Sequence, residues 1–202
     1  MLVLASASPR RRDLLAQAGY AFHILPAEVC EDLHPGEQPI PYVLRLAREK
    51  AEAVAASPEF QALAAASPEP LVSLGADTTV VAPTGEILVK PEDDADATRM
   101  LRLLSGDTHQ VITGVALIDP AHSFAETAAE VTEVTVAPLT EDAIARYIAT
   151  GEPRGKAGAY AIQGQFGRFV PRISGCYFNV VGLPLARVAA MIEAAQRRNI
   201  PR

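Results

Sequence analysis

The sequence predicts an α/β protein in which helices alternate with the strands of a mixed β-sheet. Short apolar runs, typical of buried strands, alternate with longer amphipathic segments of helical spacing. Some of these strands are separated by a helix, as in parallel pairs, and others only by a turn, as in antiparallel hairpins. With 202 residues and a hydrophobic fraction of 49%, the chain can form one compact domain or two small lobes that share a core.

The first forty residues indicate a strand, a helix, a second strand and a loop. Residues 2–5 form a short apolar strand, and Ser8-Pro9 places a serine N-cap before a helix that ends at Gly19. Residues 22–25 are a second short strand. The stretch 28–41 is rich in proline, glycine and acidic residues, which predicts a loop of the kind that often carries a site.

The middle of the chain begins with an amphipathic helix over residues 42–56, and Lys50 lies on its apolar stripe. Residues 57–70 could continue this helix before breaking it. Residues 71–76 then form a buried strand with polar groups, from Asp77 onward, at its carboxyl end.

The remaining elements follow from turn signals and helix caps. We expect a hairpin over residues 80–89 closed by Lys90-Pro91, a helix over 93–104, paired strands over 110–118 and 130–136, a helix from Thr140 to Gly151, strand-like segments at 169–170 and 177–181, and a last helix over 184–196.

Composition and charge exclude several classes of protein. A net charge of -6 argues against a general binder of nucleic acid polymers, and the apolar runs are shorter than a bilayer span requires. The N-terminus lacks the basic region of a secretory signal, and two cysteines are too few for a disulfide framework. We therefore expect a cytoplasmic protein with no membrane role.

A basic helix start, Ser6-Ala7-Ser8-Pro9-Arg10-Arg11-Arg12, follows the first strand directly. Free N–H groups, hydroxyls and arginines at a helix N-terminus form a cradle for phosphate. The alternative is that Ser8 only caps the helix while the arginines face water.

Asp77 lies at the end of a predicted buried strand, the position where open α/β sheets place ligands and catalytic groups. It could bind a divalent cation or accept a proton from water, or it could simply cap a turn. Glu31-Asp32 in the acidic loop could supply a second metal-binding carboxylate, although acidic loops are usually only solvated.

Three lysines and one glutamine complete the candidates. Lys50 either extends outward to solvent or meets an anion, because an unpaired buried ammonium is costly. Lys90 follows the hairpin, and Lys156 lies among glycines that allow close approach to a ligand or merely form a turn. Gln163 could contact the edge of a nucleotide base, or belong to an ordinary turn. The motifs of phosphate-binding loops, zinc hydrolases and serine hydrolases are absent from the sequence.

Several segments of the chain, taken in their order along the sequence, resemble the Maf family of nucleoside triphosphate pyrophosphatases. The matching segments span nearly the whole chain: Ser6-Ala7-Ser8-Pro9-Arg10-Arg11, Leu46-Ala47-Arg48-Glu49-Lys50-Ala51, Gly75-Ala76-Asp77-Thr78, Lys90-Pro91, Leu104-Ser105-Gly106, Thr113-Gly114, Gly155-Lys156-Ala157-Gly158-Ala159-Tyr160-Ala161-Ile162-Gln163-Gly164 and Asn179-Val180-Val181-Gly182-Leu183-Pro184. The chain departs from the commoner pattern at Arg12, Val89, Cys176 and Phe178.

The resemblance implies one Maf-type domain over residues 1–202, with two lobes around an extended mixed sheet and a deep cleft, as in the inosine triphosphate pyrophosphatases. It also implies hydrolysis between the α- and β-phosphates of a nucleoside triphosphate, with a divalent metal, Mg²⁺ or Mn²⁺. Asp77, Glu31, Lys50 and Lys90 are then the expected catalytic residues, with Glu31 and Asp77 at the metal. Ser8, Arg10, Arg11, Thr78, Lys156 and Gln163 are the expected substrate-binding residues.

Within the family, Arg10, Thr78 and Gln163 resemble the branch that acts on dTTP and UTP rather than the branch that acts on 7-methyl-GTP. An alternative from another class is a regulator of cell division and septum formation that senses nucleotides without hydrolysing them. The expected partner is the nucleoside triphosphate substrate, and no nucleic acid polymer is expected to bind. The sequence leaves open whether the chain forms a homodimer.

Overall fold

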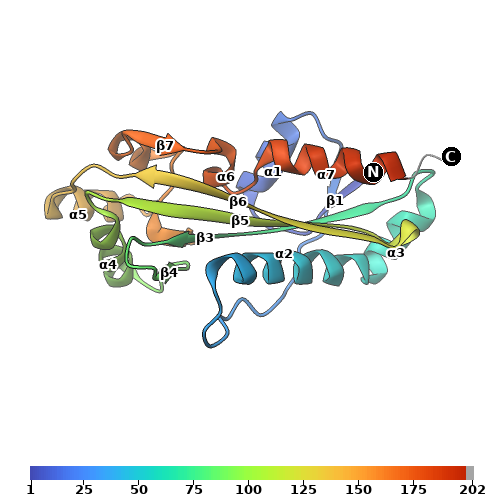
Figure 1. Cartoon of the computed structure of the whole chain (residues 1–202), viewed down its shortest axis with the longest axis horizontal. Helices are drawn as coiled ribbons and strands as arrows, with labels where there is room; N and C mark the ends of the chain where they lie inside the picture. The colour runs from blue at the N-terminus through green and yellow to red at the C-terminus, as the bar shows by residue number, and fades with distance from the viewer. Residues whose placement is uncertain (199–202) are drawn as a thin grey trace. The chain divides into compact units, whose positions relative to one another are not determined.

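The computed structural model describes residues 1–198 and confirms an α/β fold on a mixed sheet (Figure 1). Within these residues the sheet has seven strands in the order β2-β1-β3-β5-β6-β7, with β4 paired to β3. β1 pairs in parallel with β2 and β3, with Leu2 opposite Phe22 and Val72, whereas β3–β4 and β6–β7 are antiparallel. The strands are β1 (Leu2–Leu4), β2 (Phe22–Ile24), β3 (Val72–Val81), β4 (Ile87–Leu88), β5 (Thr108–Asp119), β6 (Phe124–Thr135) and β7 (Arg172–Ser174).

The helices begin where the sequence places prolines or capping residues. Ser57, Asp93 and Thr140 each accept a hydrogen bond from the backbone N–H three residues later. The helices are α1 (Pro9–Gln17), α2 (Pro39–Ala55), α3 (Pro58–Ala66), α4 (Asp94–Leu104), α5 (Glu141–Ala149), α6 (Tyr177–Val181) and α7 (Leu185–Arg198), with 3-10 turns at Pro120–His122, Ala157–Ala159 and Gln165–Phe169. No helix in this part of the chain has the length and apolarity that a membrane span requires.

The described chain divides into two compact units. The first comprises residues 1–77, 113–130 and the C-terminal segment from 182, and the second comprises residues 78–112 and 131–181. In the first unit α2 and α3 cover one face of the sheet, and α1 and α7 cover the other (Figure 1).

Two glycines on adjacent strands let α2 approach the sheet of the first unit. A Cβ atom on Gly75 of β3 would lie 2.0 Å from the Ala47 carbonyl oxygen, and one on Gly114 of β5 would lie 2.3 Å from the Val43 carbonyl oxygen. Because real Cβ atoms do not come so close to backbone, only glycine fits at these positions. The close packing holds α2, and therefore Lys50, directly against β3.

The core of the second unit is a cluster of aliphatic residues from α4 and the strands, closed by a group of aromatic rings. Leu101 and Leu104 of α4 are fully buried in it. Phe166 packs between Tyr147 and Tyr160, with ring centroids 5.1 and 4.7 Å away. These rings fix the segment 157–169, which carries Gln163, to the body of its unit.

Two elements predicted from the sequence have a different extent or type in the structure. β3 does not end before Asp77 but runs unbroken to Val81, so Asp77 lies in the middle of a strand. Residues 177–181, predicted as a strand from their aromatic and β-branched side chains, form helix α6. The reason is tertiary: buried Asn179 donates hydrogen bonds from its side chain to the Val111 carbonyl (3.0 Å) and to Thr132 Oγ1 (2.9 Å), which overrides strand propensity.

Other differences concern boundaries. Residues 57–70 begin with a separate helix, α3, rather than a continuation of α2, because Ser57 and Pro58 start a new helix. α2 itself begins three residues earlier than predicted, at Pro39, and β6 begins six residues earlier, at Phe124. The strand expected near 169–170 lies slightly later, at β7, because Phe169 ends a 3-10 turn.

Candidate active site

Three charged side chains of the first unit meet around one buried ammonium group. Lys50 Nζ lies 2.6 Å from Glu31 Oε1 and 2.7 Å from Asp77 Oδ1, so one cation bridges two carboxylates. The exposed fractions of the side chains are 8% for Lys50 and 13% for Asp77, against 39% for Glu31. Lys50 therefore meets anions, and the alternative in which it extends to solvent is wrong.

The local sequence explains how the three residues come together. Lys50 lies on the buried stripe of α2, and Asp77 follows Gly75 by two residues on β3. Because side chains two apart on a strand share a face, Asp77 points to the face that α2 covers at Gly75. Glu31 reaches the same ammonium from the loop that precedes α2.

Arg11 lies buried on α1 in the same unit. Its Nε donates to the Gly182 carbonyl at 2.9 Å and its Nη1 to Ser6 Oγ at 3.1 Å. Burial lowers the pKa of the Arg11 guanidinium, whereas the carboxylates of Asp77 and Glu31 act in the opposite direction. The guanidinium is thus buried and held by hydrogen bonds to Gly182 and Ser6, and the alternative in which Arg11 faces water is wrong.

The start of α1 leaves polar groups that capping does not use. Ser8 occupies the N-cap position, but its side chain makes no capping hydrogen bond, and its N–H donates to Ser6 Oγ at 3.2 Å. Arg10 is half-buried, which lowers the pKa of its guanidinium. Arg12 is exposed and pairs with Asp13 at 2.8 Å. Arg10 and Ser8 therefore suit an anion at the helix start better than Arg12 does.

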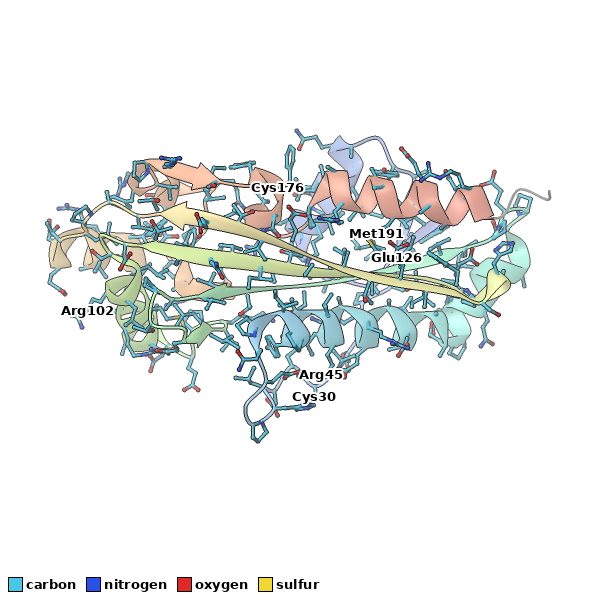
Figure 2. All side chains as sticks on the ribbon, in the orientation of Figure 1. Cys30, Arg45, Arg102, Glu126, Cys176 and Met191 are labelled. Carbon is cyan, nitrogen blue, oxygen red and sulfur yellow. The ribbon has the colours of Figure 1, made fainter. Side chains whose placement is uncertain are left out.

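The loop that carries Glu31 is held by two residues of α2 that the sequence analysis did not single out. Tyr42 donates its hydroxyl to the Glu31 carbonyl at 2.8 Å, and Arg45 donates to the Asp32 carbonyl at 3.0 Å. Arg45 also forms two 2.7 Å hydrogen bonds with the carboxylate of Glu37. Figure 2 shows Arg45 on the side of α2 from which the loop with Cys30 extends. Glu31 is thus presented by a fixed loop.

These contacts change the acidity of the groups involved. The hydrogen bonds from Arg45 lower the pKa of Glu37 from 4.5 to about 2 and raise the pKa of Arg45. Burial raises the pKa of Tyr42 to about 12, with further effect from the charges of Asp77 and Glu31. At neutral pH Glu37 is therefore ionised and Tyr42 keeps the proton that it donates to Glu31.

We expect Arg45→Met to make the backbone amides of residues 31–37 exchange about tenfold faster at pH 6, because hydrogen bonds to a charged partner are lost. Since the pKa of Glu37 is lower in the folded protein, the stabilisation is complete above pH 4.5 and is lost as the pH falls toward 2. The difference between Arg45→Met and the parent should therefore shrink below pH 4.5 in hydrogen-exchange mass spectrometry. Arg48→Met, which breaks an exposed pair with Glu52 on the same helix, is the control. An equal effect of both variants would contradict the role of Arg45.

The second unit holds the other predicted site residues. Lys90 is exposed just after β4, and Gln163 is exposed in a turn that precedes the 3-10 turn Gln165–Phe169. Lys156 donates to the backbone carbonyls of Glu152 and Arg154. Thr78 follows Asp77 on β3, so its side chain points to the opposite face of the sheet. The structure thus brings Glu31, Lys50 and Asp77 into contact in the first unit, which also holds Arg11. It places Thr78, Lys90, Lys156 and Gln163 in the second unit.

The donor set in the first unit fits a hard divalent cation. Glu31 and Asp77 supply carboxylate oxygens that converge on one point, where Lys50 now provides the positive charge. Within residues 1–198 no group of three or more His, Cys, Asp or Glu side chains could hold a metal by itself. Two carboxylates are what Mg²⁺ commonly takes from a protein when substrate phosphates complete its coordination. The residues present therefore fit a metal that arrives with a phosphorylated substrate.

The first unit thus holds a cluster of Glu31, Lys50 and Asp77 and, separately, a helix that starts with arginines. A helix N-terminus with arginines suits phosphorylated ligands. A model of the Maf-like protein family matches residues 1–195, and the chain belongs to this family.

Curated relatives match over nearly their whole length. The chain is 53% identical to the dTTP/UTP pyrophosphatase of Koribacter versatilis, covering 96% of this chain and 94% of the relative. It is 50% identical to the dTTP/UTP pyrophosphatase of Geobacter sulfurreducens, covering 93% and 92%. Among solved structures, the Staphylococcus aureus Ham1 protein aligns over 96% of this chain and 98% of its own, with 14% identity and a TM-score of 0.44, a likeness too weak to carry an argument.

Proposed function

We propose that the chain hydrolyses dTTP and UTP to the nucleoside monophosphate and pyrophosphate. The observation that carries this proposal is the buried Lys50, which holds the carboxylates of Glu31 and Asp77 within 2.7 Å of its ammonium group. The names of relatives about 50% identical over most of the chain support the same reaction.

Asp77 is proposed as the proton acceptor. Hydrolysis of a phosphoric anhydride needs a water molecule that is oriented and loses a proton as it attacks phosphorus. Asp77 is fixed by its strand and by Lys50, so little reorganisation is needed before reaction. Lys50 holds the Asp77 carboxylate in place and is itself held by Glu31, and Tyr42 and Arg45 hold the loop that carries Glu31.

The cationic residues are proposed to bind the phosphates. A triphosphate carries about four negative charges, which must be offset in a chain whose own net charge is -6. Arg10 and the N–H groups at the start of α1, with Ser8, suit phosphate oxygens, and Arg11 adds a buried positive charge. Lys90 and Lys156 of the second unit are proposed to contribute in the same way.

Mg²⁺ or Mn²⁺, held by Glu31 and Asp77 with the substrate phosphates, would neutralise part of the charge of the polyphosphate.

Three further expectations stay predictions. They are the cytoplasmic location, the single Maf-type domain and the possible homodimer.

Gln163 and Thr78 are proposed to act at the nucleoside. A glutamine amide offers both a donor and an acceptor, which matches the O4 and N3 groups of uracil and thymine. Gln163 is exposed in its turn and is therefore accessible to a ligand.

We expect Gln163→Glu to lower kcat/KM for dTTP about a hundredfold while kcat/KM for GTP falls much less, because the donor is lost and a charge is added. Gln165→Glu, at an exposed position two residues along, is the matched control. An unchanged ratio of dTTP to GTP in Gln163→Glu would show that Gln163 does not contact the base.

A panel of the purified protein with dTTP, UTP, CTP, GTP, dATP and 7-methyl-GTP tests the proposed function. Pyrophosphate and inorganic phosphate are measured separately, and binding is measured by calorimetry. We expect pyrophosphate release fastest with dTTP and UTP. Fastest release with 7-methyl-GTP would place the chain in the other branch, and tight binding without turnover would favour a nucleotide-sensing regulator.

A further inference from the structure

The turn that carries Gln163 is tied down at both ends by one pair of side chains. Tyr147 on α5 donates its hydroxyl to Glu152 Oε1 at 2.8 Å and accepts from the Ala161 N–H at 3.3 Å, before the turn. Glu152 accepts from the Gln165 N–H at 2.9 Å and the Phe166 N–H at 3.4 Å, after the turn.

The packing around this pair allows little alternative geometry. A Cβ atom on Gly164, next to Gln163, would lie 2.4 Å from Glu152 Oε1, so the backbone of the turn runs directly against the carboxylate. Ala159, which is fully buried, has a φ of 60°, a strained value for a residue with a side chain. Strain of this kind persists only where surrounding contacts over-determine the backbone.

At neutral pH Glu152 stays ionised and Tyr147 stays protonated. Burial opposes ionisation of Glu152, but the hydrogen bonds from Gln165, Tyr147 and Phe166 lower its pKa overall. Burial and the adjacent Glu152 raise the pKa of Tyr147, so the phenol stays protonated. The hydrogen bonds of this pair therefore persist at neutral pH.

We propose that the hydrogen-bonded pair Tyr147–Glu152 is a positioning device that holds the Gln163 turn in the conformation that selects uracil and thymine bases. This inference rests on the proposed role of Gln163 in base contact. It assigns selectivity to two residues that themselves lie beneath the turn.

The physical reason is that an amide discriminates between bases only when its orientation is fixed. A mobile glutamine can rotate to suit a wrong base. A fixed glutamine cannot, so polar groups stay unpaired when a wrong base binds, and the binding of that base is weakened. An exposed side chain in a turn has no such restriction of its own, so the restriction must come from the backbone on either side. Tyr147 and Glu152 supply it on both sides.

Tyr147→Phe is the test, because it removes both hydrogen bonds of the hydroxyl and keeps the ring against Phe166. Tyr160→Phe is the matched control: it also removes a buried hydroxyl beside Phe166, but that hydroxyl shares its 2.8 Å hydrogen bond with His109 Nε2 rather than with the turn. Burial lowers the pKa of His109 to about 4, so the control adds no charge near neutral pH.

We expect Tyr147→Phe to reduce the ratio of kcat/KM for dTTP to that for GTP about tenfold, mainly through a higher KM for dTTP. Tyr160→Phe should lower the melting temperature as much as Tyr147→Phe does, but should leave the ratio of kcat/KM for dTTP to that for GTP unchanged. Glu152→Gln, which keeps an acceptor oxygen and the side-chain size, should give an intermediate ratio and serves if Tyr147→Phe does not fold.

Three outcomes overturn the inference. An unchanged ratio in folded Tyr147→Phe and Glu152→Gln, with a changed ratio in Gln163→Glu, would refute the positioning role and leave the proposed function intact. Equal changes in Tyr147→Phe and Tyr160→Phe would show a general loss of stability. An unchanged ratio in Gln163→Glu would remove the proposed role of Gln163 and the inference with it.

Discussion

Asp77→Asn is expected to lower kcat for dTTP by about a thousandfold while the melting temperature changes little. The amide keeps the size and one acceptor oxygen of the carboxylate, and so keeps a hydrogen bond to Lys50, whose ammonium lies 2.7 Å from Asp77 Oδ1. It loses the basicity that the proposed proton acceptor of the attacking water needs, an effect worth about a hundredfold to ten-thousandfold. Initial rates of pyrophosphate release, with thermal melting of both proteins, measure it.

Asp119→Asn is the control for this variant. Asp119 is a buried aspartate of the same unit that accepts hydrogen bonds from His122. Its substitution should lower stability and leave kcat of the folded protein near that of the parent. Activity of Asp77→Asn within threefold of the parent would remove Asp77 as the proton acceptor.

Removal of divalent metal is expected to abolish turnover completely. Two carboxylates next to a substrate with about four negative charges repel it unless a cation lies between them. Excess chelator should therefore stop pyrophosphate release from dTTP, and Mg²⁺ or Mn²⁺ added beyond the chelator should restore it. The melting temperature of the protein without substrate should not move, because within residues 1–198 no cluster of three metal-binding side chains holds an ion alone.

Glu31→Gln separates the metal from other effects of chelation. It removes one of the two proposed ligands, so a higher Mg²⁺ concentration should be needed for half-maximal activity. Full activity of the parent in excess chelator would contradict the metal requirement. A normal Mg²⁺ requirement in Glu31→Gln would remove Glu31 from the metal site.

The order of helices and strands could be predicted because caps, turns and periodicity are local signals. Thr140 and Asp93 accept capping hydrogen bonds at the starts of the helices that they predicted. The predicted hairpin over residues 80–89 is formed by the end of β3 and by β4, which pair Val80 with Leu88. Helix α6 could not be predicted in the same way, because the contacts of Asn179 join it to strands 68 and 47 residues away in the sequence.

Part of the candidate site could be predicted because it too has a local signal in the sequence. Lys50 places a charge on an apolar helix stripe, which indicates either a buried partner or a path to solvent, and Glu31 and Asp77 are its partners in the structure. Tyr42 and Arg45 carry no such signal, since an aromatic residue and an arginine at the start of an amphipathic helix are ordinary. Glu152 was missed because its importance depends on Tyr147 and on the turn at Gly164, which meet only in the folded chain.

The products formed from dTTP by the purified protein with Mg²⁺ test the central claim most directly. Separation by ion-exchange chromatography and identification by mass spectrometry should show dTMP and pyrophosphate in equal amounts, with no dTDP, and Asp77→Asn purified in parallel should form neither. Formation of dTDP and inorganic phosphate, or equal product formation by the parent and Asp77→Asn, would contradict the assignment of this chain as a nucleoside triphosphate pyrophosphatase.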